Sequence, residues 1–585
     1  MYDLIIQNGT IFDGTGAAPF RGDIGIKGDR IAFVGKIDDE TAAGCQIIDA
    51  SGKTITPGFI DPHTHVDLSI LTDPAMEPYL KQGVTTVVTG NCGYNMAPQG
   101  DEVFYWSMMD IDFLEQAGMD PNESFPLFFD KEKAAHAMKT KYHIQLDWKT
   151  FDDFNRKCDT LPLGCNTAPL IGYSALRTAV MGKDCLREAT EEETIQLKQL
   201  TRECMEAGAF GLSTGRDPVY LPGPYASDAE MHLILQVVAE YGGIFTSHTY
   251  NCGPDGRPDR LGGYKEMIRQ ASGLDMKINI SHVHVMHMAD NGEAAIAAAK
   301  ETLSLFKQLQ KNGIDLSYDV LPSPACADFT QRSCGYYLKP LVLMSGSRKQ
   351  LAKNFQDPLF RQMVHQMVKN GTMAYFNVDA NSNWFGQLCI LAHRDHTVIG
   401  KSILSLAKER DAHPLDALMD LFTDDPDMIA DLTAPDFGEA VKLLCHSEMA
   451  MPCSDGSSNP KEANLLGHPE IPVFPNSMNI GYIPRYLTKY GSDDFAHAVH
   501  QASGFVAKRF DIKNRGILKA GNFADIVIMD RNALHSYDED PDPLQDPEGI
   551  EYVFVNGQLA CKDKTLTGNF SGRVLRKEKS PQRHI

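Results

Sequence analysis

The feature that most constrains the fold is a series of eight short apolar runs between residues 58 and 454, many of them followed by helix-length amphipathic segments. Such alternation is typical of βα units, which build a parallel sheet. The runs are Gly58–Asp61, Val84–Thr89, Ala168–Ile171, Ala209–Ser213, Ile244–Ser247, Lys277–Ser281, Ile314–Asp319 and Ala450–Ser454. They predict an α/β fold, a (β/α)8 TIM-like barrel with its active site at the carboxyl ends of the strands. A doubly wound open sheet is the less favoured alternative.

Both ends of the chain are rich in short strand-like runs separated by turns. Near the start they are Asp3–Gln7, Thr10–Phe12, Asp23–Lys27, Arg30–Val34 and Gln46–Asp49, and near the other end Ile526–Met529 and Ile550–Val555. We therefore expect residues 1–57 and 517–575 to form one small β-sandwich-like domain. Residues 58–516 would then form the catalytic barrel. Insertions are expected near 94–160 and 322–448, as lids or packed elements, because these stretches are too long for plain loops.

Charge and cysteine usage narrow the class of protein. The formal net charge of −22 argues against nucleic acid or an anionic membrane as the main partner. No apolar run approaches the length of a membrane-spanning helix, and no signal-peptide pattern stands at the start. The 13 cysteines are scattered without framework spacing. These observations favour a reduced, cytoplasmic enzyme that acts on a small molecule, and a homo-oligomer is compatible with them.

Two histidines follow the first barrel run, in Asp61-Pro62-His63-Thr64-His65. Residues two apart in an extended segment point the same way, so His63 and His65 can aim at one point just past the strand. Neutral imidazoles are good ligands for zinc. A His-x-His pair alone is more often two unrelated histidines. Its place after an apolar strand favours a metal site here.

Further ligand candidates stand at the same relative place in other βα units. Cys92 ends the second run, His248 the fifth and His282 the sixth. Each alone would more often be structural, but the strand ends of a barrel converge on one face. Asp455 ends the eighth run, in Ser454-Asp455-Gly456, where a turn is the plainer interpretation. We expect Asp455 to be a metal ligand or the group that accepts a proton from an attacking water.

These motifs resemble those of the amidohydrolase superfamily. The segment Thr56–His65 resembles its metal-binding motif, and Gly90-Asn91-Cys92-Gly93 resembles the D-aminoacylase (N-acyl-D-amino-acid deacylase) branch. Supporting matches include Phe210–Gly215, Cys453–Gly456 and Asn514–Asp525. The resemblance implies a zinc-dependent amide hydrolase with a barrel and a small β-domain. Cys92, His248 and His282 would hold a tighter zinc, and His63 and His65 would share a bridging Cys92 at a second, weaker one. Asp455 would be the catalytic acid–base group.

The sequence departs from the family pattern on the substrate side. The usual lysine of Ser-His-x-Lys is His284, the second tyrosine of Tyr-Pro-Tyr is Ser323, the arginine of His-x-Arg is Tyr250, the histidine of Gly-His-Gly is Tyr173, and the arginine of His-Pro-Arg is Glu470. Losing cationic side chains weakens the electrostatic case for an anionic substrate. Arg177, near the third run, remains a candidate for holding an anion.

We therefore predict a metal-dependent amide hydrolase whose substrate is not a simple N-acyl-D-amino acid. His284, Ser323, Arg177, Tyr173 and Tyr250 are the candidate substrate-binding residues. Opening of a cyclic amide, lactone or carbamate stays open, because one site can serve several carbonyl reactions. A catalytically inactive barrel scaffold is the alternative outside enzymes. The presence of all five candidate ligands and Asp455 argues against it.

Overall fold

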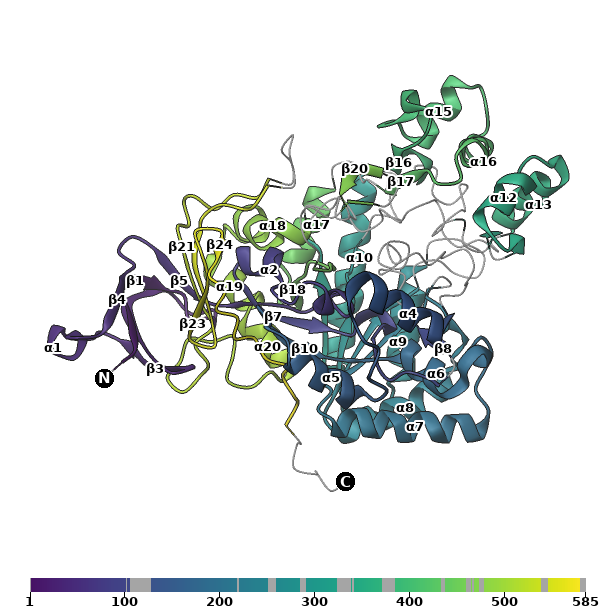
Figure 1. Cartoon of the computed structure of the whole chain (residues 1–585). Helices are drawn as coiled ribbons and strands as arrows, with labels where there is room; N and C mark the ends of the chain where they lie inside the picture. The colour runs from purple at the N-terminus through teal and green to yellow at the C-terminus, as the bar shows by residue number, and fades with distance from the viewer. Residues whose placement is uncertain are drawn as a thin grey trace.

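The computed structural model shows a barrel flanked by a small β-domain and by a helical lobe (Figure 1). It describes residues 2–101, 103–105, 128–217, 220–250, 259–284, 291–322, 338, 341–342, 344–370, 384–432, 437–458, 464–465, 468–472, 478–537 and 545–578. The structural statements below refer to these residues.

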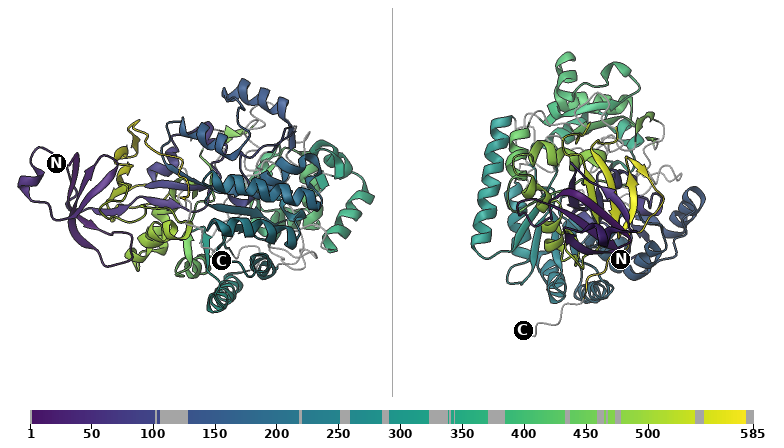
Figure 2. Two further views of the ribbon diagram at one scale, coloured as in Figure 1. Left: turned by 90° about the horizontal axis from the view of Figure 1, so that it is seen from below. Right: turned by 90° about the vertical axis from the view of Figure 1, so that its left-hand side faces the viewer.

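Strands from both ends of the chain form one nine-stranded sheet, in the order β24-β23-β22-β21-β5-β1-β2-β3 with β4 paired to β1. The strands are β1 (Leu4–Ile11), β2 (Phe20–Lys27), β3 (Arg30–Gly35), β4 (Gln46–Asp49), β5 (Thr54–Pro57), β21 (Ile526–Met529), β22 (Ile550–Val555), β23 (Gln558–Lys562) and β24 (Thr565–Leu566). Antiparallel pairing of β5 with β21 joins the two ends. Figure 2 shows the early and late strands side by side.

Two strands of this sheet differ from the sequence prediction. β1 runs unbroken through Asn8-Gly9, where two separate strands were expected, because a register shift between Ile6 and Gly9 absorbs the turn residues. β5 was not predicted. It lies between β1 and β21 and is buried along its whole length, so only its neighbours reveal it as a strand.

The eight predicted barrel runs all form parallel strands. They are β6 (Phe59–Asp61), β7 (Val84–Thr89), β10 and β11 (Asn166–Pro169 and Ile171–Gly172), β12 (Gly211–Gly215), β13 (Ile244–His248), β14 (Lys277–Ile280), β15 (Leu316–Val320) and β18 (Ala450–Pro452). The third strand is interrupted at Leu170, so that β10 pairs with β7 and β11 with β12. A parallel bridge between Thr64 and Gly456 closes the ring just beyond the first and last strands. The expected TIM-like barrel is confirmed.

Helices cover the barrel between these strands. They are α2 (Glu77–Lys81), α6 (Tyr173–Met181), α7 (Glu191–Glu206), α8 (Asp228–Glu240), α9 (Arg260–Gln270), α10 (Gly292–Lys311), α17 (Gly438–Cys445), α18 (Met478–Arg485), α19 (Phe495–Gln501) and α20 (Gly504–Phe510). Local sequence explains where they begin. Thr190 and Glu193 form a reciprocal capping box at the start of α7. Its apolar positions Leu197, Cys204 and Met205 are buried toward the barrel.

Both long insertions contain secondary structure. The first holds the hairpin β8–β9 (Val103–Tyr105, Phe128–Asp130), α4 (Lys131–Tyr142) and α5 (Phe151–Asp159). The second holds α12 (Arg348–Asn354), α13 (Pro358–Lys369), α14 (Trp384–Gln387), β16 (Leu388–Ala392), α15 (Ile403–Glu409), α16 (Pro414–Asp424) and β17 (Ile429–Leu432), the lobe at the upper right of Figure 1. Pro414 is the first residue of α16, a position where its fixed φ and missing N–H suit a helix start. Leu351, Phe355 and Phe422 are buried there, so the lobe has packed apolar contacts of its own.

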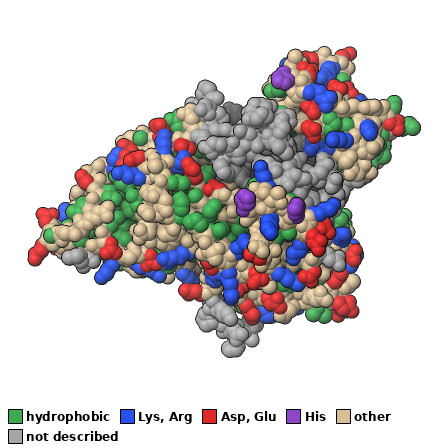
Figure 3. Space-filling model, in the orientation of Figure 1, with side chains coloured by type: hydrophobic (Ala, Val, Ile, Leu, Met, Phe, Trp, Pro, Cys, Tyr) green, Lys and Arg blue, Asp and Glu red, His purple; other side chains and the backbone are tan. Residues whose placement is uncertain are grey.

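Acidic and basic side chains are intermixed on the face shown in Figure 3. Ten of the thirteen cysteines lie in the described part of the chain, and each is a free thiol. No described helix is long and apolar enough to span a membrane.

Candidate metal centre

The six residues predicted at the barrel face come together at one place. His63 and His65 follow β6, and Cys92 lies in the short turn Asn91–Gly93 after β7. His248 is the last residue of β13, His282 follows β14, and Asp455 follows β18. The strand ends therefore bring together side chains up to 392 positions apart (63 to 455).

Cys92 is at the centre of the first group. Its Sγ atom lies 3.3 Å from Nε2 of His63, 3.4 Å from Nε2 of His282 and 3.9 Å from Nδ1 of His248. The last two imidazole nitrogens are 2.8 Å apart. One sulfur thus faces three imidazoles that come from three different strands.

Asp455 joins the two histidines of the His-x-His pair in a second group. Its Oδ1 atom lies 3.1 Å from Nε2 of His63 and 3.0 Å from Nε2 of His65. The side chain of Asp455 is 14% exposed, whereas that of His63 is fully buried. His63 Nε2 therefore faces both Cys92 and Asp455, and the two groups share it.

Backbone geometry at three of these residues is unusual for side-chain-bearing residues. Cys92, His282 and Asp455 have φ angles of 53°, 33° and 53°. The left-handed region is uncommon outside glycine, and residues held there are often part of functional sites. These turns aim the three side chains back over the strand ends instead of letting each strand continue.

Carboxylates that the sequence analysis did not single out lie behind the imidazoles. Oδ1 of Asp319 is 3.1 Å from Nδ1 of His63, and Oδ2 of Asp217 is 3.3 Å from Nε2 of His248. Asp61 accepts a hydrogen bond from the backbone N–H of His63. The sequence held one signal for Asp319. It ends the seventh predicted strand, and His248 directly follows the fifth.

The electrostatics of the cluster favour charged side chains. Burial alone would raise the pKa of the Cys92 thiol, but positive charge on His63 and His282 and contacts with His248 hold it well below its usual value. Burial would also raise the pKa of Asp455, and the same two histidines, with His65, hold that pKa well below its usual value. The cluster thus favours a thiolate beside a carboxylate, the anionic forms that bind metal ions.

The donor set fits a zinc ion. Nitrogen and sulfur ligands at ordinary zinc distances in a tetrahedral array are about 3.3–3.6 Å apart. The Cys92–His63 and Cys92–His282 separations of 3.3 and 3.4 Å match this spacing, the Cys92–His248 separation of 3.9 Å is slightly wider, and the His248–His282 separation of 2.8 Å is shorter. His63, Cys92 and His282 form one group with ligand geometry, and His63, His65 and Asp455 form another.

Aromatic rings stand beside the cluster. The ring of Tyr220 lies 3.9 Å from that of His248, between centroids, and stacks on Tyr94 at 5.5 Å. Tyr94 in turn meets the edge of His65 at 6.0 Å. Both tyrosines are buried, so they form an aromatic wall at one side of the metal ligands.

Two predicted substrate-side residues are half-buried, and one of them lies beside the cluster. His284 is half-buried, and its ring centroid is 6.4 Å from that of His282. Tyr250 is half-buried after β13, and burial followed by the charges of Asp259 and Glu266 raises the pKa of its hydroxyl. Ser323 lies outside the described residues, and so does the side chain of Glu470.

Arg177 and Tyr173 are held differently from the sequence prediction. Both sit in α6 and are fully buried, and both donate hydrogen bonds to Oε1 of Glu230 in α8. Arg177 also donates to the backbone oxygens of Cys185 and Arg187. Glu230 therefore offsets the charge that was expected to hold a substrate anion.

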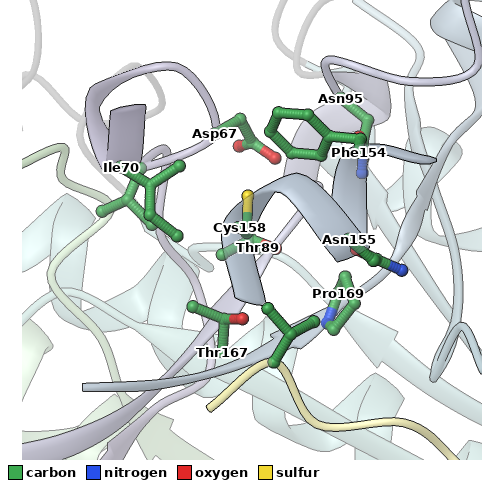
Figure 4. A pocket seen from close by; sticks show the side chains of 11 residues that line it. Asp67, Ile70, Thr89, Asn95, Phe154, Asn155, Cys158, Thr167 and Pro169 are labelled. Atoms are coloured by element: carbon green, nitrogen blue, oxygen red, sulfur yellow. The ribbon is translucent and has the colours of Figure 1, made fainter. Parts of the chain in front are cut away.

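A small pocket lies between α5 and the carboxyl ends of β7 and β10 (Figure 4). Asp67, Thr89, Thr167 and residues of α5, including Phe154 and Cys158, line it. Asp67 follows His65 by two positions, and neither its Oδ2 atom nor Nδ1 of His65 has a hydrogen-bond partner. The pocket therefore lies next to the chain segment that carries His63 and His65.

A third group of metal-ligating side chains lies in the helical lobe. Nε2 of His365 in α13 is 3.1 Å from Oδ1 of Asp416 in α16, and the rings of His365 and His413 are 5.0 Å apart. Nδ1 of His413 accepts the N–H of Leu415 at the start of α16, and Arg361 also approaches Asp416 at 3.7 Å. These contacts describe a helix cap and ion pairs between helices.

Comparisons with known proteins agree with this geometry. The model of the amidohydrolase family matches residues 46–381. The chain is 29% identical over 582 residues to a D-aminoacylase of Alcaligenes xylosoxydans xylosoxydans, covering 98% of this chain and 97% of that protein. An N-acyl-D-glutamate deacylase of the same organism is 26% identical over 580 residues, covering 99% and 97%.

The fold also matches a solved D-aminoacylase. The TM-score is 0.70 at 26% identity, and the alignment covers 99% of this chain and 100% of the other. That D-aminoacylase is described as having a binuclear metal centre, in which one metal activates and the second attenuates.

Proposed function

We propose that this chain, which belongs to the amidohydrolase family, cleaves an amide C–N bond at the cluster on its barrel face, with zinc as the metal. It is a metal-dependent amide hydrolase by its relationships along nearly its whole length. The identity of the metal, the roles of individual residues and the substrate class are the proposal.

Cys92, His248 and His282 would hold the tighter zinc. His63 and His65 would hold a second, weaker one, with Cys92 bridging. The position of Cys92 supports this assignment, because its sulfur lies 3.3–3.9 Å from three imidazole nitrogens. Thiolate and imidazole are preferred zinc ligands. When bound, zinc polarises the substrate carbonyl and makes a water molecule more acidic.

Asp455 would accept the proton of the attacking water and deliver it to the leaving nitrogen. The observation that carries the proposal is the position of this carboxylate. Its Oδ1 is within 3.1 Å of both His63 and His65, and it is more exposed than either. A general base must lie within hydrogen-bond reach of the proton that it takes. The positive charge around Asp455 keeps it ionised, which is the form a base requires.

The substrate would lack the free carboxylate of a simple N-acyl-D-amino acid. Two arginines follow the third and fourth barrel strands, and each is already paired with a glutamate. Arg177 contacts Glu230, and Nη2 of Arg216 lies 2.9 Å from Oε1 of Glu266. Where the family pattern has a lysine, this chain has the half-buried His284. The Tyr94–Tyr220 wall favours a flat or apolar group.

Product formation by zinc-loaded protein across a mixed substrate panel tests this function. The panel pairs N-acetyl-D- and N-acetyl-L-amino acids with their carboxamides, and adds neutral aryl amides, cyclic amides and lactones. We expect each carboxamide to be cleaved faster than the matching N-acetyl-amino acid. We also expect the neutral amides to be cleaved faster than the acids. Faster, D-selective cleavage of the acids would contradict the proposed substrate class, and activity on lactones alone would contradict amide cleavage.

A further inference from the structure

We propose that Asp319 is a positioning residue that sets the affinity of the metal centre by holding His63 and His282 at the same time. This inference rests on the proposed metal site and deepens it. Asp319 is the fourth residue of β15 and is fully buried. It does not face the opening, so its role is to act through other side chains.

One oxygen of Asp319 reaches both histidines. Oδ1 lies 3.1 Å from Nδ1 of His63 and accepts the backbone N–H of His282 at 2.5 Å. Because Nε2 of His63 faces Cys92 and Asp455, Nδ1 is the ring nitrogen that faces Asp319. A carboxylate behind a ligating imidazole fixes the ring and its tautomer, and makes the ring a better ligand.

The contact with His282 acts through the backbone. His282 has a φ of 33°, a conformation that costs free energy for a residue with a side chain. The side chain of Asp319 accepts the N–H of His282, and its backbone oxygen accepts the N–H of Val283 at 2.8 Å. These two bonds hold the turn after β14 in the shape that aims His282 at Cys92.

Asp319 is itself held from the side away from the histidines. Its Oδ2 atom accepts from Nδ2 of Asn279 at 2.6 Å, and Asn279 in turn accepts from the hydroxyl of Ser317 at 2.8 Å. Asn279 and Ser317 are both fully buried. The carboxylate is thus fixed by Asn279 of β14 while it orients His282, which follows the same strand, and His63, which follows β6.

His63 belongs to both groups with ligand geometry, and His282 belongs to one of them. Among the proposed ligands, His63 belongs to the weaker zinc and His282 to the tighter one, so Asp319 contacts one ligand of each. Loss of its charge is expected to weaken metal binding at both positions, whereas loss of a ligand such as His65 would weaken one. This difference separates a positioning role from direct ligation.

The test measures zinc affinity of the metal-free full chain by competition with a chelator, together with the absorption spectrum of the cobalt-substituted protein. Asp319→Asn keeps the shape and removes the charge, and we expect zinc affinity to fall by about 10- to 100-fold. The thiolate-to-cobalt absorption band should shift. Asp23→Asn is the matched control, because Asp23 is another buried aspartate, in the small β-domain, that accepts hydrogen bonds from two backbone N–H groups. It should leave affinity and spectrum unchanged.

The outcomes separate the two proposals. Zinc affinity and a cobalt spectrum equal to wild type in Asp319→Asn would overturn the role of Asp319 and leave the proposed function standing. A wild-type protein that binds no zinc would overturn both. If Asp319→Asn does not fold, Asn279→Ala keeps the carboxylate and frees it to move. That variant should bind zinc severalfold more weakly, and unchanged affinity there would also overturn the proposal.

Discussion

Oδ1 of Asp455 lies 3.0 Å from Nε2 of His65, although 390 positions separate the two residues. Backbone hydrogen bonds across the barrel seam create this contact. The N–H of Asp455 donates to the oxygen of His63 at 3.0 Å, and the N–H of His65 donates to the oxygen of Gly456 at 2.6 Å. The seam that closes the barrel therefore places the acid–base candidate against the His-x-His pair.

Replacing the carboxylate of Asp455 tests that role. Asp455→Asn keeps the size of the side chain but cannot accept the proton, so turnover should fall by about 10²- to 10⁴-fold or more. Zinc content, measured by elemental analysis, should stay near that of the wild type if Asp455 is not an essential ligand. Asp159→Asn, at an exposed ion pair with Arg576, is the control and should keep full activity. Near-normal turnover in Asp455→Asn would remove it as the acid–base group.

Removing the thiol tests the bridging ligand. Cys92→Ala should lower both the zinc content per chain and the rate, because the sulfur contacts three imidazoles. Cys204→Ala removes another buried thiol, from α7, and should retain zinc. Elemental analysis of the two variants side by side decides the point. Wild-type zinc content in Cys92→Ala would show that the sulfur bridges nothing.

The barrel and the clustering of the six candidate side chains could be predicted from the sequence because their signals are local and repeated. The first, second, fifth, sixth and eighth apolar runs are each followed by a side chain that can bind a metal or accept a proton, and a barrel brings such ends to one face. His63, Cys92, His248 and His282 all carry this signal. The small β-domain was also visible, because alternating runs recur at both ends.

Pairing between side chains could not be predicted in the same way. Arg177 looks available in the sequence, but Glu230, 53 positions later, offsets its charge. Asp319 ends the seventh predicted run, but its contacts with His63 and His282 are defined only once the neighbouring strands are placed. The missed strand β5 has the same cause, because its burial on both sides depends on strands from both ends of the chain. Such facts depend on packing between distant elements.

The Arg177–Glu230 pair gives a prediction about stability instead of substrate binding. Arg177→Met leaves Glu230 buried without its charge partner, and Glu230→Gln does the reverse. Each should lower the free energy of unfolding by about 3–5 kcal/mol. The double variant should recover much of this loss. Glu240→Gln, at the exposed pair with Arg202, should cost at most about 1 kcal/mol.

Chemical denaturation measures these changes, and steady-state kinetics supplies the contrasting readout. If Arg177 instead held a substrate anion, Arg177→Met would raise KM for N-acetyl-D-amino acids and leave KM for their carboxamides unchanged. We expect no such selectivity. A selective rise in KM with unchanged stability would restore the substrate role that the sequence suggested.

Zinc affinity should rise with pH. Burial by itself would lower the pKa values of His65 and His248, but Asp455 and Cys92 raise the pKa of His65 to about 10. Asp217 and Cys92 raise the pKa of His248 to about 9. In the metal-free protein both rings are therefore protonated at neutral pH, and zinc must displace those protons to bind. For each displaced proton the apparent affinity should increase about tenfold per pH unit, until the pH approaches these pKa values.

Competition titrations at three pH values between about 6.5 and 8.5 measure this slope, with proton release followed by an indicator dye. His65→Gln provides the contrast, because it removes one of the two protons, and its affinity should rise less steeply with pH. A wild-type affinity that is flat or falls over this range would show that the ligands are already deprotonated in the metal-free protein. In that case zinc would bind without displacing protons from His65 and His248.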